Sequence, residues 1–486
     1  MTPLLLSRPF AAPTLALAGA LVVLAPACAT NPATGQRQLS LIGEQQEIAM
    51  GREADQQVVA QLGLYPDEGV QRYVERVGRA LAAASERPDL PWTFRVVDDP
   101  VVNAFALPGG FIYVTRGILT HFDSEAQLAA VVGHEIGHVT GRHSVERISK
   151  AQLAQLGLGI GAIVEPEVAN YADLAQTGLS VLFLKYSRDD EREADSLGLR
   201  YLTRKSYAAG EMPEVFALLD RVSAAAGGGR IPGWLATHPA PENRRERITA
   251  EIASTGAPAG GTVRAAEYLA AIDGMVFGDD PRQGFFESTA FYHPELAFRL
   301  RFPEGWQTQN TRQAVAALSP GRDAIAVLTL EEGDSPRAAA QRFFAQQGLT
   351  RGNAFSGRFG GLAAEASFFA VDRAQGEDLT GVAAFVAHGG RVFRLLGYAA
   401  ASDFRRYQSA LEAAAASFGP LTDRAKLNVR PRRIEIVRLP GAMTLEAFAR
   451  RYPSTVDVAT LALINQVEPG ATLRAGARVK RVVGGP

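Results

Sequence analysis

The sequence predicts an α+β protein in which a mostly helical domain is followed by a strand-rich domain and a small third module. Three observations predict this class. Before about residue 280, several stretches carry apolar residues every three to four positions, as amphipathic helices do. Phe291 to Leu330 instead alternates apolar and polar residues, which is typical of half-buried strands. Arg433 to Val483 reads as strand, helix, helix and strand.

Length and composition fit a globular protein of several domains. The chain has 486 residues, of which 47% are hydrophobic and 21% are charged. Such a length allows about two to four domains, each with its own core. The net charge is −1, so we expect no nucleic-acid partner.

The first 27 residues predict a signal peptide for export. Arg8 is followed by "FAAPTLALAGALVVLAPA", an apolar stretch that ends in small residues. Cys28, the only cysteine, comes next, so no intrachain disulfide can form. Its position indicates lipidation at Cys28. The alternatives are ordinary cleavage near Ala27 or Ala29, or an uncleaved anchor. All of them place the chain outside the cytoplasm, in a bacterial envelope and periplasmic, with possible attachment to a membrane through the lipid.

The elements up to the main motif follow from periodicity and turn residues. Residues 28–41 read as a polar linker rich in turn formers. Ile42 to Leu64 and Val70 to Ala84 predict helices, and "WTFRVVDD" and "GGFIYVTRGIL" predict strands. Ser124 to Ser149 predicts one long helix with Ser124 as its N-cap.

The next stretches predict further helices. Ala151 to Val164 is nearly devoid of charge, but 14 residues are too few to span a bilayer. We expect a buried core helix there or a lid over the active site. Leu174 to Ala209 predicts a long helical region, which is followed by a Gly-rich loop and a basic helix.

The segment "VVGHEIGHV" carries the strongest chemical signal. His134 and His138 are four residues apart, so a helix presents both imidazoles on one face. This spacing lets two imidazoles bind one Zn²⁺, with Glu135 between them as general base toward the activated water. Burying these groups in an apolar run would be costly without a cation to pair with them.

A catalytic zinc site needs a third protein ligand, and "RDDEREAD" offers one. Glu191 and Asp195 are four residues apart and share a helix face, whereas Glu193 points elsewhere. We assign Glu191 as the ligand and Asp195 as the acceptor that orients a ligand imidazole. His143 competes for the third position, but on one helix it lies about 140° from the direction of His138.

Four segments together resemble the M48 metallopeptidases. "NAFALPGGFIYVTRGIL", "HEIGHVTGRHS", "YSRDDEREADSLG" and "THPAPENR" occur in the family's order, and the resemblance covers Gln38 to Ile252. It implies a gluzincin-type zinc metallopeptidase domain over residues 42–280, with one Zn²⁺ held by His134, His138 and Glu191.

The resemblance also implies roles around the metal. The strand in "AFALPGGFIYV" would be an edge strand that pairs with an extended substrate, lined by Asn103, Ala104 and Phe105. His238 would approach the zinc from a loop. Arg244 would stabilise the oxyanion, although the repeated arginines of "RRER" leave Arg247 as an alternative. A plain structural strand and a loop histidine are the simpler interpretations.

The C-terminal half carries no comparable site. Residues 285–420 predict an α+β accessory domain, and "FYHPELAFRLRFPEGW" is similar to PsbP/Mog1-like domains. Residues 432–484 resemble a LysM-like βααβ module. Such modules bind peptidoglycan, but the usual "GDTL" is "GAMTL" here, so packing or peptide contact is the alternative.

These signals predict an exported zinc endopeptidase. We expect protein or peptide substrates, namely misfolded or surplus envelope proteins. The alternative is an envelope chaperone or scaffold whose metalloprotease site is latent because His238 fills the fourth zinc position. A prenyl-protein protease is disfavoured because the sequence lacks a set of long transmembrane helices.

Overall fold

The computed structural model describes residues 28–155, 185–225, 234, 237–239, 243–256, 260–333, 335–372 and 376–485. The chain divides into two compact units. Unit 1 is Met1–Ala60, Leu64–Ile272 and Leu463–Val467; unit 2 is Gln61–Gly63, Asp273–Ala462 and Glu468–Pro486. The predicted signal peptide, most of the charge-poor segment 151–164, and residues 174–184 of the predicted helical region lie outside the described residues.

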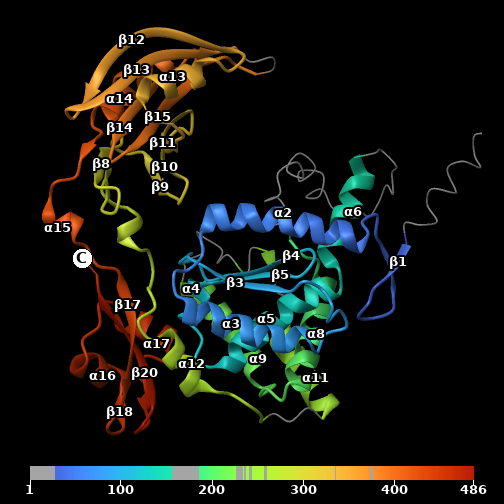
Figure 1. The fold of residues 1–486 in the computed structure, drawn as a ribbon. Coiled ribbons are helices and arrows are strands. Elements are labelled where there is room, and N and C mark those ends of the chain that lie inside the picture. Colours follow the sequence, from blue (N-terminus) through green and yellow to red (C-terminus); the bar gives the residue numbers. More distant parts are fainter. Residues whose placement is uncertain are drawn as a thin grey trace, which may run out of the picture. The chain divides into compact units, whose positions relative to one another are not determined.

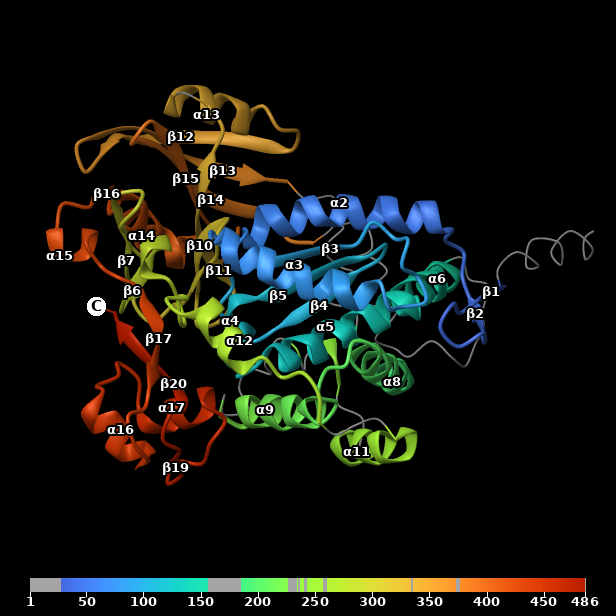
Figure 2. The same ribbon diagram turned by 60° about the horizontal axis from the view of Figure 1, so that its bottom comes forward.

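Unit 1 surrounds a three-stranded sheet in the order β3-β5-β4, with β3 and β5 parallel and β4 antiparallel to β5. Helix α2 runs along one face of this sheet and α5 along the other (Figures 1 and 2). The strands are β1 (Cys28–Thr30), β2 (Arg37–Leu39), β3 (Thr93–Val97), β4 (Ala104–Leu107) and β5 (Phe111–Thr115). The helices are α2 (Glu44–Leu62), α3 (Glu68–Ala82), α4 (Arg116–Leu119), α5 (Glu125–Thr140), α6 (His143–Gln155), α8 (Arg188–Arg204), α9 (Glu211–Ala225), α11 (Arg244–Thr255) and α12 (Ala265–Ile272).

Side-chain caps fix where the two helices of the motif region begin. The Ser124 hydroxyl accepts a hydrogen bond from the backbone N–H of Gln127 and starts α5. At the start of α8, Ser187 and Asp190 form a reciprocal capping box. Each cap satisfies backbone donors that the first turn of a helix leaves unpaired.

The single helix predicted over Ser124 to Ser149 is wrong, because the chain breaks it after Thr140. Arg142 has a φ of 57°, in the left-handed region, and α6 starts at His143 in a new direction. Left-handed geometry is unfavourable for a residue with a Cβ. It is held here because the Arg142 guanidinium donates to Glu47 Oε2 at 3.0 Å and to the carbonyl of Ile42 at 2.8 Å.

The linker predicted over residues 28–41 is partly ordered. Strands β1 and β2 pair antiparallel as a hairpin, with Cys28 opposite Leu39 and Thr30 opposite Arg37. The Asn31 side chain closes the turn by accepting from the backbone N–H groups of Ala33 and Thr34. Residues 28–41 therefore include a β-hairpin, which the turn-rich composition of this segment did not predict.

Unit 2 begins earlier than the boundary predicted at residue 280. The backbone N–H of Gly274 donates to the carbonyl of Ile434, and that of Phe277 donates to Arg432. Residues 273–277 thus extend the C-terminal strand pair instead of ending the helical domain.

The accessory domain contains two sheets. A seven-stranded sheet has the order β12-β13-β14-β15-β11-β10-β9, and a four-stranded sheet has the order β16-β8-β7-β6. Their strands are β6 (Phe285–Glu287), β7 (Ala290–His293), β8 (Phe298–Arg301), β9 (Gln307–Asn310), β10 (Ala314–Leu318), β11 (Ala324–Glu331), β12 (Leu349–Phe359), β13 (Leu362–Val371), β14 (Leu379–His388), β15 (Arg391–Ala400) and β16 (Gly419–Pro420). The helices are the 3₁₀ turn η4 (Pro281–Gln283), α13 (Pro336–Phe344), α14 (Phe404–Ala416) and α15 (Arg424–Leu427).

Two helices cover the seven-stranded sheet because its strands alternate. Ala384 of β14 belongs to the core formed with α14, whereas its neighbour Phe385 belongs to the core formed with Phe343 of α13. Successive strand residues point to opposite faces, so the helices lie on opposite faces of the sheet.

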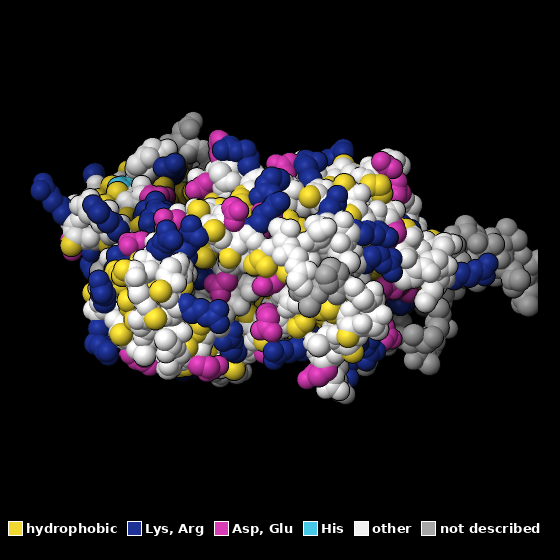
Figure 3. Space-filling model, turned by 90° about the horizontal axis from the view of Figure 1, so that it is seen from below, with side chains coloured by type: hydrophobic (Ala, Val, Ile, Leu, Met, Phe, Trp, Pro, Cys, Tyr) yellow, Lys and Arg dark blue, Asp and Glu magenta, His cyan; other side chains and the backbone are white. Residues whose placement is uncertain are grey.

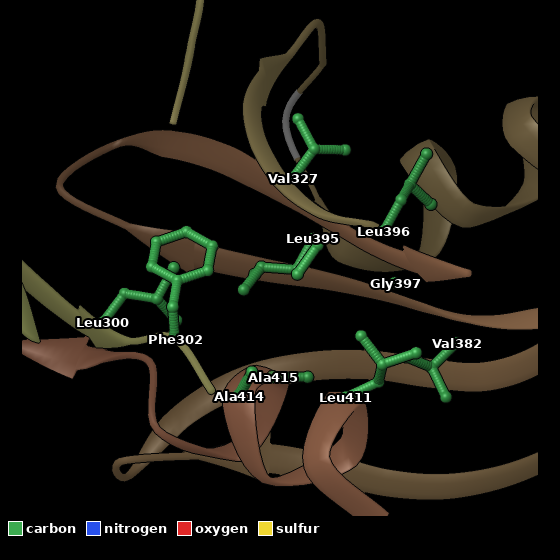
Figure 4. A pocket seen from close by; sticks show the side chains of 11 residues that line it. Leu300, Phe302, Val327, Val382, Leu395, Leu396, Gly397, Leu411, Ala414 and Ala415 are labelled. Carbon is green, nitrogen blue, oxygen red and sulfur yellow. The ribbon is translucent and has the colours of Figure 1, made fainter. Parts of the chain in front are cut away.

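A small apolar cavity lies between α14 and the sheet (Figure 4). Its lining residues are all apolar or glycine: Leu300, Phe302, Ala326, Val327, Val382, Leu395, Leu396, Gly397, Leu411, Ala414 and Ala415. Such a lining offers packing but no titratable group for chemistry.

The last module has the predicted order of strand, helix, helix and strand. Strands β17 (Arg432–Arg438) and β20 (Arg478–Gly484) pair antiparallel, and α16 (Leu445–Arg451) and α17 (Val458–Ile464) lie between them in sequence. The short strands β18 (Met443–Thr444) and β19 (Thr472–Leu473) form a second pair.

Helix hydropathy and the distribution of surface charge both bear on function. Within the part of the chain that the structure describes, no helix is long and apolar enough to cross a membrane. On the face shown in Figure 3, lysine and arginine side chains lie among aspartate and glutamate side chains. This mixture agrees with the net charge of −1.

Candidate metal centre

Helices α5 and α8 approach closely enough to bring their functional side chains together. A Cβ added to Gly137 of α5 would lie 2.9 Å from the carbonyl oxygen of Ala194, and one added to Gly198 of α8 would lie 3.0 Å from the backbone nitrogen of His134. Only glycine permits such contacts. The glycines of "GHEIGH" and "DSLG" therefore set the distance between the two helices.

Four side chains converge where these helices meet. His134 and His138 come from α5, Glu191 from α8, and His238 from the segment before α11. One ligand atom from each lies within 4.8 Å of all the others. His134 Nε2 is 3.0 Å from His138 Nε2, and Glu191 Oε2 is 3.5 Å from His134 Nε2.

His238 enters the same cluster from the other side. Its Nδ1 lies 2.9 Å from Glu191 Oε1 and 3.4 Å from His134 Nε2. Its Nε2 lies 3.5 Å from Glu135 Oε1. The structure thus brings His238 together with all three predicted ligands and with the predicted base.

The donor set fits a zinc ion. The four side chains are at most 1% exposed, so water does not solvate them. Glu191 Oε2 and His238 Nε2 are buried without a hydrogen-bond partner, although Arg244 Nη2 lies 3.3 Å from the Glu191 oxygen. A bound cation would reduce the cost of burying these atoms. Imidazole nitrogen and carboxylate oxygen are the ligands of catalytic zinc sites. We infer that His134, His138 and Glu191 would hold the ion.

The charges of the cluster suit metal binding. Burial lowers the pKa of His138 well below its ordinary value. Burial acts to raise the pKa of Glu191, but the nearby histidines His238 and His134 outweigh it and hold that pKa well below its usual range. A neutral imidazole and an ionised carboxylate are the forms that bind metals.

Glu135 is positioned by an indole. It is fully buried, and the Trp234 Nε1–H donates to its Oε1 at 3.3 Å. Its Oε2 has no hydrogen-bond partner. This oxygen is therefore free to exchange a proton with a group bound at the cluster.

Asp195 contacts His134, a predicted metal ligand, on the side of the ring that faces away from the cluster. Its Oδ1 lies 2.9 Å from His134 Nδ1, which leaves the Nε2 of that imidazole for the metal. Arg244 donates to both oxygens of Asp195, at 2.9 and 2.5 Å, and Arg247 Nη2 lies 2.5 Å from Oδ2. Burial acts to raise the pKa of Asp195, but the charge of Arg244 outweighs it and lowers that pKa.

Arg244 also contacts aromatic rings. Its guanidinium lies 4.7 Å from the ring centre of Trp234 and 4.1 Å from that of Phe216. Its Nη1 is buried without a hydrogen-bond partner. The alternatives Arg244 and Arg247 therefore share Asp195, and Arg244 is the more buried of the two.

The predicted substrate strand is an edge strand. Among the described residues, strand β4 pairs on one side only, with Ala104 opposite Val114 and Phe105 opposite Tyr113. Asn103 precedes β4, and its carbonyl accepts from the backbone N–H of Thr115. Strand β4 contacts α5, which carries the histidine motif.

Sequence reasoning did not identify two aromatic residues of the centre. The Tyr186 ring stacks on the imidazole of His138, with ring centres 3.7 Å apart, and Trp234 stacks on His238 at 4.8 Å. Trp234 lies four residues before His238, and the backbone N–H of His238 donates to the backbone carbonyl of Trp234. That spacing was the available signal for Trp234. For Tyr186, the available signal was its place as the first residue of the segment "YSRDDEREADSLG".

His143 lies outside the cluster of candidate ligands. Its Nδ1 lies 2.9 Å from Nδ1 of His138, the ring nitrogen opposite to the one that faces the cluster. The sequence argument against it assumed one straight helix. The break at Arg142 invalidates that geometry, but His143 still stays outside the cluster.

Two helices, two histidines and a downstream glutamate form a gluzincin-like arrangement at this site. Residues 68–252 match the model of Peptidase family M48.

Two curated relatives share part of the chain. The mitochondrial metalloendopeptidase OMA1 of Arabidopsis thaliana is 36% identical over 185 residues, which are 37% of this chain and 36% of the relative. The putative beta-barrel assembly-enhancing protease of Vibrio cholerae is 36% identical over 187 residues, 37% of this chain and 38% of the relative. The chain thus spans little more than a third of the length of either relative.

Among solved structures, cyanobacterial PsbP from Synechocystis matches 28% of this chain and 94% of its own, with a TM-score of 0.24 and 14% identity. A TM-score this low does not establish the fold of the accessory domain.

Proposed function

We propose that this protein is a zinc metalloendopeptidase that hydrolyses peptide bonds of cell-envelope proteins. The observation that carries the proposal is the buried convergence of His134, His138 and Glu191 beside the free Oε2 of Glu135. The match of residues 68–252 to family M48 and the metalloendopeptidase names of relatives support the same activity.

Each residue of the centre has a task in peptide hydrolysis. His134, His138 and Glu191 hold the ion. When bound, zinc supplies Lewis-acid chemistry that polarises a carbonyl and makes water nucleophilic at neutral pH. Glu135 accepts the proton of the attacking water at Oε2 and passes it to the leaving amine. Arg244, whose Nη1 has no hydrogen-bond partner, stabilises the negative charge that develops on the carbonyl oxygen.

The substrate would be an extended polypeptide. Strand β4 has one edge without a strand partner in the part of the chain that the structure describes, and an extended chain can add there as a further strand. Asn103, Ala104 and Phe105 would provide the backbone groups for this pairing. Misfolded or surplus envelope proteins offer such extended segments, and relatives named beta-barrel assembly-enhancing protease favour this class.

The location and the appended modules belong to the same proposal. Export by the signal peptide and lipidation of Cys28 would place the enzyme in the periplasm at a membrane. The PsbP/Mog1-like domain would select substrates, and the LysM-like module would bind peptidoglycan. The strand, helix, helix and strand order of residues 432–484 supports the last assignment.

A second function, that of an envelope chaperone or scaffold with a latent site, is favoured by one contact. His238 Nδ1 lies 2.9 Å from Glu191 Oε1 within the ligand cluster. As a fourth ligand it would fill the position that an active site keeps open. Burial acts to lower the pKa of His238, but the charges of Glu191 and Glu135 outweigh it and raise that pKa.

Zinc content and casein cleavage test the proposal together. Wild type should hold one zinc per chain. Glu135→Gln should retain the zinc but cleave casein ~10²–10⁴-fold more slowly, because the general base is lost. Glu68→Gln, which changes an exposed glutamate, is the matched control. Equal cleavage by wild type and Glu135→Gln would show that the mechanism is wrong. Cleavage that appears only in His238→Ala would establish the latent form.

A further inference from the structure

The two ligand histidines have different partners on their outer nitrogens. His134 Nδ1 meets a carboxylate oxygen of Asp195 at 2.9 Å. His138 Nδ1 instead meets a second imidazole, at 2.9 Å from Nδ1 of His143. His143 is 2% exposed, and the proposed mechanism does not use it.

The direction of this imidazole contact follows from metal binding. His138 Nε2 faces the cluster, so its lone pair must be free for the ion and its proton must sit on Nδ1. His138 Nδ1–H then donates to Nδ1 of His143, which must accept. The proton of His143 is therefore on Nε2, which lies 3.4 Å from Glu193 Oε1.

The network ends in the N-terminal hairpin. Asn31 Oδ1 accepts from the backbone N–H groups of Ala33 and Thr34, which fixes the orientation of the amide. The Asn31 Nδ2–H₂ group accordingly points toward Glu193 and donates to its Oε1 at 2.7 Å. Asn31 is 5% exposed, so this contact is shielded from water.

The helix break supplies the geometry. On a continuous helix His143 would point well away from His138. The left-handed residue Arg142 redirects the chain, and Glu47 and the Ile42 carbonyl hold its guanidinium. The turn at Arg142 therefore places the His143 ring within hydrogen-bond distance of His138 Nδ1.

We propose that His143 is the positioning residue of the zinc ligand His138. It holds the Nδ1–H form of His138 and the orientation of its ring, while Glu193 and Asn31 hold His143 in turn. This inference rests on the proposed metal site. Partners of this kind raise metal affinity because they fix the ring and the tautomer before the ion binds.

Zinc affinity, measured by competition with a chromophoric chelator on the full chain, tests the proposal. His143→Ala should weaken zinc binding ~10–100-fold. His143→Asn, whose amide oxygen can accept from His138 Nδ1–H, should recover most of that loss. Glu193→Gln and Asn31→Ala should weaken binding less, in that order. Asp189→Asn, an exposed residue on the same helix, should bind zinc like wild type.

The ¹⁵N chemical shifts of the zinc-loaded protein provide a second readout that a purely structural role would not change. His138 should be protonated at Nδ1 in wild type and in His143→Asn, with a mixed or altered signal in His143→Ala. If His143→Ala binds zinc within twofold of wild type, or if Ala and Asn lose affinity equally, the inference is wrong. Absence of zinc binding by wild type would instead overturn the proposed function.

Discussion

The α5–α8 interface of unit 1 and the α14–sheet interface of unit 2 bury side chains by opposite strategies. The first encloses three histidines, two glutamates, an aspartate and an arginine, each at most 5% exposed. The second encloses almost exclusively apolar residues and a small apolar cavity. Buried charges are costly unless they are paired or bind a metal. The comparison therefore favours the α5–α8 interface as the place of the chemistry and gives the α14–sheet interface a packing role.

Removing one charge from the first interface should give the largest effect on stability. Asp195→Asn removes the carboxylate closest to both the buried Arg244 and the half-buried Arg247, each at 2.5 Å. The carboxylates that remain are farther away, with Glu191 at 3.3 Å from Arg244 and Glu251 at 3.5 Å from Arg247. Breaking a buried ion pair in this way costs about 3–5 kcal/mol of the free energy of unfolding. Urea unfolding should measure this loss of stability, and amide hydrogen exchange should show that the loss lies in unit 1.

Asp189→Asn is the matched control for this prediction because its side chain is 89% exposed on the same helix. It should stay within about 0.5 kcal/mol of wild type. An Asp195→Asn variant as stable as this control would mean that the ion pairs do not stabilise the centre.

Truncating a residue of the apolar interface should cost less and should not affect the metal. Leu411→Ala enlarges the cavity beside α14 (Figure 4). Deleting a buried leucine side chain typically costs about 3 kcal/mol. The loss should appear in unit 2 by hydrogen exchange, with zinc content unchanged. A loss of zinc in this variant would contradict the separation of roles between the two interfaces.

Acid should destabilise unit 2 through the half-buried His293. Burial lowers the pKa of His293 to about 4, from an ordinary value of 6.5. The unfolded chain therefore binds a proton more readily than the folded chain. The stability contributed by the neutral imidazole is complete above about pH 6.5 and is lost as the pH falls toward 4.

The expected loss is at most about 3 kcal/mol, and less to the extent that solvent reaches the ring. Unfolding free energies of wild type and His293→Gln between pH 7 and 4 provide the measurement. The variant should lose less stability over this range. Parallel curves would show that His293 does not titrate abnormally.

The convergence of most residues of the candidate site was predictable from the sequence because these residues are close to one another along two helices. His134, Glu135 and His138 share one helical turn, and Glu191 and Asp195 share another. Helical spacing shows which of these side chains share a face, and zinc chemistry then suggests their roles. The alternation in β11 and the helix–helix order of the last module were readable for the same reason.

What the sequence did not reveal depends on contacts between distant residues. The break at Arg142 is held by Glu47, which is 95 residues away, and helical periodicity continues through it. Asn31 and Glu193 are 162 residues apart. Tyr186 reaches His138 through packing alone. No local pattern encodes such partners, so only the folded chain shows them.

Anomalous diffraction at the zinc edge from crystals of the zinc-loaded protein tests the central claim most directly. The account predicts one peak within bonding distance of His134 Nε2, His138 Nε2 and a Glu191 oxygen, and no peak there in Glu191→Ala. The position of His238 in the same map would separate the open enzyme from the latent form. A zinc ion held elsewhere, or a wild-type protein that takes up none, would contradict the account.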